Sequence, residues 1–217
     1  SGINGAIRNT AGDNVINGTF TMTVGNGNTK IISDNAGSLT LNGNIAANTT
    51  TRVLDLGGDS VGNNAFNGVL SNASSPGLAK SGTGTWTLSG VNTYTGDTTV
   101  SGGTLSLTSP SLDNASTVII GSGSTLNLNF SGNDIIGSLQ INGSGPLAPG
   151  VYDASHPTYG SSFTGAGKLV VVTGASGTWT SLSDGVWEEP TNWASNTIAT
   201  GFNALGGFAL DAAANDR

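Results

Sequence analysis

The sequence predicts an all-β protein built as a parallel β-helix, in which short strands stack as successive coils of a solenoid. Apolar and small polar residues alternate in runs such as 85–88 and 104–107, and glycine closes these runs. Such alternation is typical of short half-buried strands that end in tight turns. A Ser/Thr-Leu-x-Leu pattern also recurs at a regular spacing, which favours stacked coils.

The recurring pattern occurs at 38–41, 104–107 and 125–128, with a tryptophan version at 85–88. Leu88 and Leu107 are 19 residues apart, and Leu107 and Leu128 are 21 apart. This spacing has the size of one solenoid coil, and the 47 residues from Leu41 to Leu88 correspond to two longer coils.

Strand-like runs follow one another along most of the chain, and their apolar positions define the expected core. The runs are 15–24, 39–45, 53–56, 66–70, 86–88, 105–107, 118–120, 126–130, 135–141 and 169–172. The side chains expected to point inward are Leu39, Leu41, Leu88, Val100, Leu105, Leu107, Leu126, Leu128 and Leu169, with Tyr94 at a corner over Leu88 or Val100.

Asn-Gly pairs begin at Asn4, Asn17, Asn42, Asn67 and Asn142. Both residue types tolerate a positive φ, which sharp corners often need. Stacked asparagines at equivalent corners are expected to form side-chain ladders between coils. In hairpins the same pairs would mark two-residue turns, so an antiparallel β-sandwich is the alternative fold.

Composition limits the partners of the chain. The 217 residues include no cysteine, so packing and hydrogen bonds must hold the core. A net charge of -7 with scattered basic residues disfavours nucleic acid. No apolar run approaches the roughly 20 residues of a membrane-spanning helix, and we expect Ser1 to be a processed or excised start.

The segment 78–107 closely resembles the passenger-associated transport repeat of autotransporter passenger domains and very large bacterial surface proteins. Trp86 stands where that family more often has leucine. The resemblance implies a right-handed parallel β-helix located outside the cell, and it implies no particular reaction. The residues that carry it are Lys80, Gly82, Gly84, Trp86, Leu88, Gly90, Asn92, Tyr94, Gly96, Thr99, Val100, Gly103 and Leu105.

The segment 131–172 is similar to the stretch that closes β-helix modules in large bacterial repeat proteins, where a Pro-Gly-x-Tyr turn at 149–152 precedes a last strand. We therefore expect a β-helix domain over 1–174 and a Trp-rich segment over 175–217. Trp179, Trp187 and Trp193 are candidates for a glycan platform or a subunit contact.

Few residues are candidates for chemistry. His156 is the single histidine, in a turn-like stretch that suggests an exposed loop, and the adjacent Glu188 and Glu189 would point to opposite faces of a strand. Asp55 and Asp59 are candidate ligands for a hard cation such as calcium, although their spacing fits no standard calcium loop. We assign no catalytic, cofactor or metal site.

The sequence therefore predicts a non-enzymatic structural module of a bacterial cell-surface or extracellular assembly. Neither end shows a recognisable cap, so we expect copies to associate head to tail as a fibre or stalk, with 175–217 packing on the next subunit. A carbohydrate-binding adhesin is the first alternative, and a polysaccharide-degrading β-helix is the second.

Overall fold

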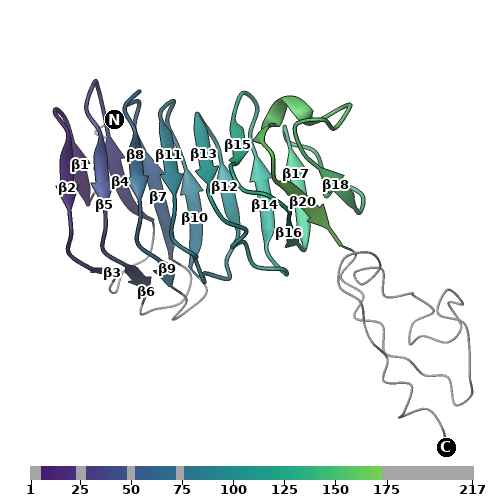
Figure 1. Cartoon of the computed structure of the whole chain (residues 1–217), viewed down its shortest axis with the longest axis horizontal. Helices are drawn as coiled ribbons and strands as arrows, with labels where there is room; N and C mark the ends of the chain where they lie inside the picture. The colour runs from purple at the N-terminus through teal and green to yellow at the C-terminus, as the bar shows by residue number, and fades with distance from the viewer. Residues whose placement is uncertain (1–5, 23–27, 48–51, 72–75, 173–217) are drawn as a thin grey trace, which may run out of the picture. The chain divides into compact units, whose positions relative to one another are not determined.

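The computed structural model describes residues 6–22, 28–47, 52–71 and 76–172 (Figure 1). These residues form short β-strands and one 3-10 helix, η1 (Gly160–Ser162). The strands are β1 (Ile7–Asn9), β2 (Asn14–Ile16), β3 (Phe20–Met22), β4 (Thr29–Ser33), β5 (Leu39–Leu41), β6 (Ile45–Ala47), β7 (Val53–Gly57), β8 (Asn64–Phe66), β9 (Leu70–Ser71), β10 (Gly77–Lys80), β11 (Thr85–Leu88), β12 (Thr98–Val100), β13 (Thr104–Leu107), β14 (Thr117–Ile120), β15 (Thr125–Leu128), β16 (Asn133–Ile136), β17 (Ser138–Ile141), β18 (Gly150–Tyr152), β19 (Phe163–Gly165) and β20 (Lys168–Val171).

The strands stack as the faces of a β-solenoid (Figure 1). The first face has the order β1-β4-β7-β10-β12-β14-β17, and the second has β2-β5-β8-β11-β13-β15-β19. The third face is divided into β3-β6-β9 and β16-β20-β18. Within the described residues the neighbouring strands are parallel, apart from β18 on β20. The parallel solenoid is confirmed, and the antiparallel sandwich is wrong.

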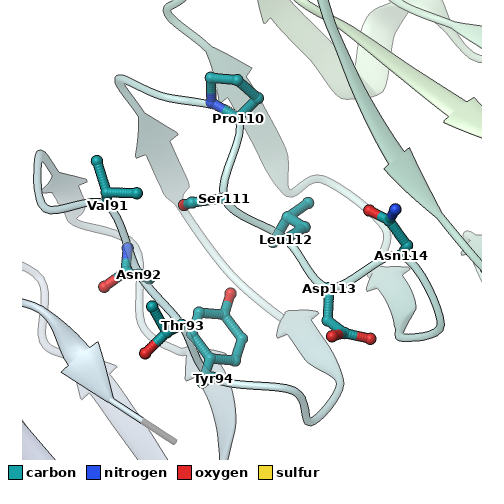
Figure 2. A pocket seen from close by; sticks show the side chains of 9 residues that line it. All are labelled: Val91, Asn92, Thr93, Tyr94, Pro110, Ser111, Leu112, Asp113 and Asn114. Carbon is teal, nitrogen blue, oxygen red and sulfur yellow. The ribbon is translucent and has the colours of Figure 1, made fainter.

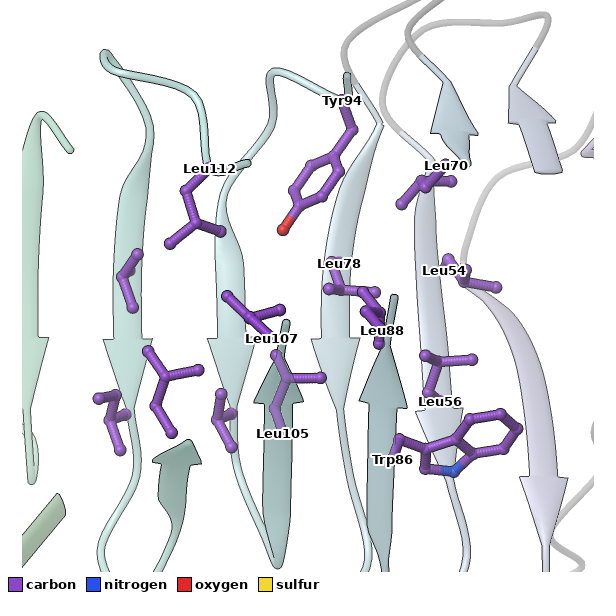
Figure 3. Packing of buried hydrophobic residues seen from close by; sticks show 14 of the residues in the cluster. Leu54, Leu56, Leu70, Leu78, Trp86, Leu88, Tyr94, Leu105, Leu107 and Leu112 are labelled. Atoms are coloured by element: carbon purple, nitrogen blue, oxygen red, sulfur yellow. The ribbon is translucent and has the colours of Figure 1, made fainter. Parts of the chain in front are cut away.

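The core consists of apolar columns that run through consecutive coils. Leu88 pairs with Leu107, which pairs with Leu128, and Figure 3 shows several of these side chains packed together. All nine residues predicted to point inward are at most 1% exposed. Burying one leucine side chain stabilises the fold by about 1.5–3 kcal/mol. Phe66 of β8 lies between Leu41 and Leu88, which confirms the two coils inferred there.

Asparagine side chains form the predicted ladder along one corner. The amide nitrogen of Asn42 donates to Oδ1 of Asn17 at 2.7 Å, and that of Asn67 donates to Oδ1 of Asn42 at 2.8 Å. The hydroxyl of Ser89 then donates to Oδ1 of Asn67 at 2.8 Å. The amides of Asn42 and Asn67 thus bond to the coils on either side, in addition to the backbone ladders.

The glycines beside this ladder have a different role from the one predicted. Gly18, Gly43 and Gly68 do not have positive φ values, whereas Asn142 (54°) and Gly143 (76°) do. A Cβ on Gly43 would overlap the carbonyl of Gly18, and a Cβ on Gly68 would overlap that of Gly43. Glycine is therefore required at these two corners because adjacent backbones approach closely.

The coils become shorter toward the C-terminal part of the solenoid. Equivalent positions Asn17 and Asn42 are 25 residues apart, whereas the contact between Asp97 and Thr117 spans 20 residues. The third-face strand is absent between β11 and β12 and again between β13 and β14. Omitting that strand accounts for the shorter coils.

An insertion over 142–162 covers part of the C-terminal end of the described solenoid. The backbone nitrogen of Leu147 donates to the carbonyl of Leu139 at 2.8 Å, and β18 covers the edge of β20. Pro149 precedes β18, and proline lacks the donor needed to continue a ladder. The predicted turn at 149–152 thus contains a short strand, and the predicted last strand at 169–172 is β20. We did not predict the cap itself.

Candidate functional site

The segment 78–107 lies in the middle of the solenoid, where the third-face strand is lost. It contains β11, β12 and β13 together with most of β10. Leu88, Val100 and Leu105 are fully buried, whereas Thr99 is only partly buried. The segment therefore joins the longer coils to the shorter ones.

Lys80 occupies a position that is apolar in the adjacent coils. Its partners in register are Leu56 of β7 and Val100 of β12, and its side chain is fully buried. The ammonium group donates to the carbonyls of Ser81, Gly82 and Gly102 at 2.8, 2.9 and 3.0 Å. Burial lowers the pKa of Lys80 to about 8, an effect that nearby Asp55 opposes. Lys80 therefore connects the corners of two consecutive coils.

The glycines of the segment are required for two different reasons, a positive φ or close contact with the preceding coil. Gly82 and Gly103 have φ values of 72° and 60°, which disfavour other residue types. A Cβ on Gly84, Gly90 or Gly96 would overlap a backbone carbonyl of the preceding coil. Both groups allow adjacent coils to turn close to one another.

Trp86 fills the core between Asn64 of β8 and Leu105 of β13. It is 1% exposed, and its indole nitrogen donates to the carbonyl of Gly57 at 3.0 Å. A leucine, the more frequent residue of the resembled family, has no donor for this carbonyl. Trp86 therefore joins the second face to the end of β7 on the first.

Asn92 and Tyr94 lie where the third-face strand is missing. The Oδ1 atom of Asn92 accepts the backbone N–H of Leu70 at 2.9 Å, and its amide nitrogen donates to Gly90 at 3.0 Å. Tyr94 is 1% exposed, as predicted for the corner, and its hydroxyl lies 2.7 Å from that of Thr98. Burial raises the pKa of Tyr94 above its usual range.

Asp134 has a similar role one coil beyond the repeat. Its Oδ2 atom accepts the backbone N–H groups of Ser111 and Leu112 at 3.0 and 3.2 Å. The side chain points inward from β16 and its residue is 5% exposed. Burial raises the pKa of this carboxyl to about 6 despite the two hydrogen bonds. We did not single out Asp134, although the alternation of Asp134 with Ile136 would have indicated its inward position.

A groove of about 360 Å³ lies along the missing part of the third face (Figure 2). Segments 91–94 and 110–114 of two neighbouring coils line it. Its polar groups include Asn92, Ser111 and Asp113, and the exposed Val91 lies at its margin. The groove thus offers a mixed polar and apolar surface.

The carboxylates considered for a cation have protein partners. Asp55 lies 3.2 Å from the ammonium of Lys30 and accepts the hydroxyl of Ser81 at 2.7 Å. Asp59 accepts the backbone N–H of Asn35 at 3.0 Å. The part of the chain that the structure describes contains no group of three or more residues suited to a metal ion.

His156 lies in a loop of the 142–162 insertion, as expected, although its side chain is only partly exposed. Its ring stacks on Tyr152 with centroids 4.8 Å apart, and Nδ1 accepts the backbone N–H groups of Thr158 and Tyr159. These contacts indicate that His156 helps to hold the cap. Trp179, Trp187, Trp193, Glu188 and Glu189 lie outside the described residues.

Comparison with protein families identifies the central segment. Residues 78–107 match the family model for the passenger-associated-transport-repeat, which confirms the resemblance seen in the sequence. No curated protein and no solved structure matches the chain. The repeat and the solenoid together fit an autotransporter passenger-like module. Among the described residues, none of the helical structure has the length and apolar character needed to cross a bilayer.

Proposed function

We propose that this chain is a non-enzymatic structural module of a bacterial cell-surface or extracellular assembly, acting as a stalk or fibre. The observation that carries the proposal is a transport repeat set within an unbroken series of stacked coils. Each coil bonds to its neighbours through backbone ladders and through side chains such as Asn42 and Lys80. A solenoid joined in this way is a rigid rod.

The composition and the surface positions of the strands are compatible with a location outside the cell. Only 9% of the residues are charged, and cysteine is absent. On the second face, the outward-pointing Thr40 pairs with Ala65, which in turn pairs with Thr87, and all three are small neutral residues. Stability therefore depends on ladders and packing, which need neither a reducing nor an oxidising compartment.

Surface display tests this function. The chain is fused to the translocator domain of an autotransporter, and intact cells are treated with a protease and labelled with antibody. We expect folded chain on the outer surface, and a Trp86→Ala variant with a weakened core should reach it in smaller amount or be degraded. Folded chain that remains inside the cell would contradict the proposal.

Self-association is the more specific part of the proposal. Copies join head to tail, and residues 175–217 of one copy pack on the next. Electron microscopy and light scattering of the purified chain should show filaments or larger assemblies that grow with concentration. A chain that stays monomeric at high concentration would contradict self-association and leave the stalk role standing.

A carbohydrate-binding adhesin is the second candidate. Three tryptophans within fifteen residues favour it, since indole faces stack on sugar rings. The polar groove between segments 91–94 and 110–114 is a further surface of suitable character. Binding on a glycan array that is lost in Trp187→Ala would support this function, and absence of binding to any glycan tested would count against it.

A further inference from the structure

The second face of the solenoid presents two rows of small side chains to solvent. Alternation directs Trp86 and Leu88 of β11 into the core, so Thr85 and Thr87 point outward. The register of the strands places these threonines beside equivalent residues of the neighbouring coils. One row is Thr85, Thr104 and Thr125. The other row is Thr40, Ala65, Thr87, Ser106, Asn127 and Thr164, and the two rows together form what we call the threonine face.

The side-chain polar groups of the threonine face have no hydrogen-bond partner among the described residues. The corners differ, because Asn42 and Asn67 bond to neighbouring coils there and the hydroxyl of Thr108 donates to the carbonyl of Leu88 at 3.3 Å. Ser106 shows the contrast best, since it is only 4% exposed and its hydroxyl still has no partner in the described part of the chain. Buried hydroxyls are nearly always paired, either with protein or with ordered water. The partner of these groups is therefore water.

The hydroxyls are regularly spaced because hydrogen bonds hold the strands in register. Neighbouring strands lie about 4.8 Å apart, and outward residues two positions apart on one strand lie about 6.6 Å apart. Figure 1 shows β5, β8, β11 and β13 side by side and pointing the same way. A sheet stays flat over many strands when side-chain ladders stack along it, as the asparagine ladder and the leucine columns do here. The hydroxyls and the water bound to them thus repeat in two dimensions.

The chemistry of the threonine face disfavours other ligands. None of its residues is charged, so it attracts neither phosphates nor metal ions. None of them is aromatic, so it has no ring to stack on a sugar and no anchor of the kind that dominates protein interfaces. The first face is different, because it carries the ion pair between Lys30 and Asp55, and Thr99 lies beside Ile119. The ligand that suits the threonine face is water in an ordered form.

We propose that the threonine face binds ice. Water oxygens on the surfaces of an ice crystal repeat at distances close to the spacing between strands and to the two-residue spacing along a strand. Water held by the hydroxyls can therefore become part of the crystal lattice, since each hydroxyl both donates and accepts a hydrogen bond. The stacked coils fix the rows before binding, so little side-chain order has to be created. This function goes beyond the structural role and does not depend on self-association.

An interruption in the second row provides a test in the direction of gain. Ala65 lies between Thr40 and Thr87 and has no hydroxyl. Ala65→Thr completes the row with a residue that favours strands, so it should strengthen ice binding. Thr87→Tyr has the opposite purpose, because it places a large ring in the middle of the face. Thr99→Tyr is its matched control, since Thr99 is a partly buried outward threonine on β12 of the first face.

Thermal hysteresis, the gap between the melting and freezing temperatures of a single ice crystal in a solution of the full chain, measures binding. We expect wild type and Thr99→Tyr to shape the crystal and to open the same gap. Thr87→Tyr should lose most of the gap, and Ala65→Thr should exceed wild type. Thermal unfolding of all four proteins shows whether they are folded, and Ala65→Thr keeps the test decisive if Thr87→Tyr does not fold.

Three results would overturn the inference. A wild-type chain that neither shapes ice nor opens a gap would remove ice binding and leave the structural role standing. Equal gaps for wild type and folded Thr87→Tyr, or no gain in Ala65→Thr, would show that the rows of hydroxyls are not the binding surface. Co-sedimentation of wild type with crystalline cellulose that is lost in Thr87→Tyr, without activity on ice, would make a polysaccharide the ligand of this face instead.

Discussion

The first three coils and the transport repeat hold adjacent coils together in different ways. In the first three, the third face is a sheet of backbone ladders, β3-β6-β9, with an asparagine ladder beside it. In the repeat the third strand is absent, and Asn92 supplies an oxygen to the backbone of Leu70. Asp134 does the same for Ser111 and Leu112 two coils later. The difference shows that a side-chain oxygen can replace a strand, so a solenoid can shorten its coils without leaving amides unpaired.

Removing the largest side chain of the repeat should have the largest effect. Trp86→Ala leaves a cavity in the core and an unpaired carbonyl at Gly57, so we expect the free energy of unfolding to fall by about 3–5 kcal/mol. Trp86→Leu should cost less, because it keeps part of the packing. Urea unfolding of wild type, Trp86→Ala and Trp86→Leu measures these free energies. Equal losses in the two variants would show that packing at this position does not matter.

The second largest loss of stability is expected when a methyl group is added at a corner glycine of the repeat. A Cβ on Gly90 would overlap the carbonyl of Gly68, so Gly90→Ala should lower the free energy of unfolding by about 1–3 kcal/mol. Gly145→Ala, with open space at its Cβ, should change it by less than about 0.5 kcal/mol. Similar midpoints of thermal unfolding for the two variants would show that the coils do not approach as closely as described.

The asparagine ladder of the first coils should contribute less per residue. Asn42→Ala removes the bonds to both Asn17 and Asn67 on an exposed corner, so we expect a loss of about 1 kcal/mol in the free energy of unfolding. Asn114→Ala, an exposed asparagine outside the ladder, is the control and should be neutral. Guanidinium titrations of wild type and the two variants measure their free energies of unfolding. An unchanged value for Asn42→Ala would show that the asparagine ladder does not stabilise the fold.

The last expected effect is a pH dependence from Asp134. Burial raises its pKa from 3.8 to about 6, so the folded state binds a proton more readily than the unfolded state. Its contribution to stability is fully present below about pH 4 and is lost as pH rises through about 6. The difference between wild type and Asp134→Asn in the free energy of unfolding should therefore decline from pH 4 to pH 7. A constant difference would show that this carboxyl is not buried.

Much of the fold follows from alternation and spacing alone. The inward leucines were predictable because one face of each strand must be apolar, and the strand-like runs 15–24 and 39–45 contain two strands each because Asn17 and Asn42 make corners. Apolar content is a poor guide where a polar residue points inward. Lys80 follows Leu78 by two residues, so alternation places it in the core, although its three carbonyl partners come from segments that only the fold brings together. The cap over 142–162 depends on an antiparallel pairing that the coil repeat does not contain.

Amide hydrogen exchange tests most directly whether side chains replace the third strand. The N–H of Ile45 is held by the backbone carbonyl of Val69, whereas that of Leu70 is held by the side chain of Asn92. The account predicts slow exchange at both positions in wild type, and faster exchange at Leu70 with unchanged exchange at Ile45 in Asn92→Ala. Fast exchange of Leu70 in wild type, or no change in the variant, would contradict the account.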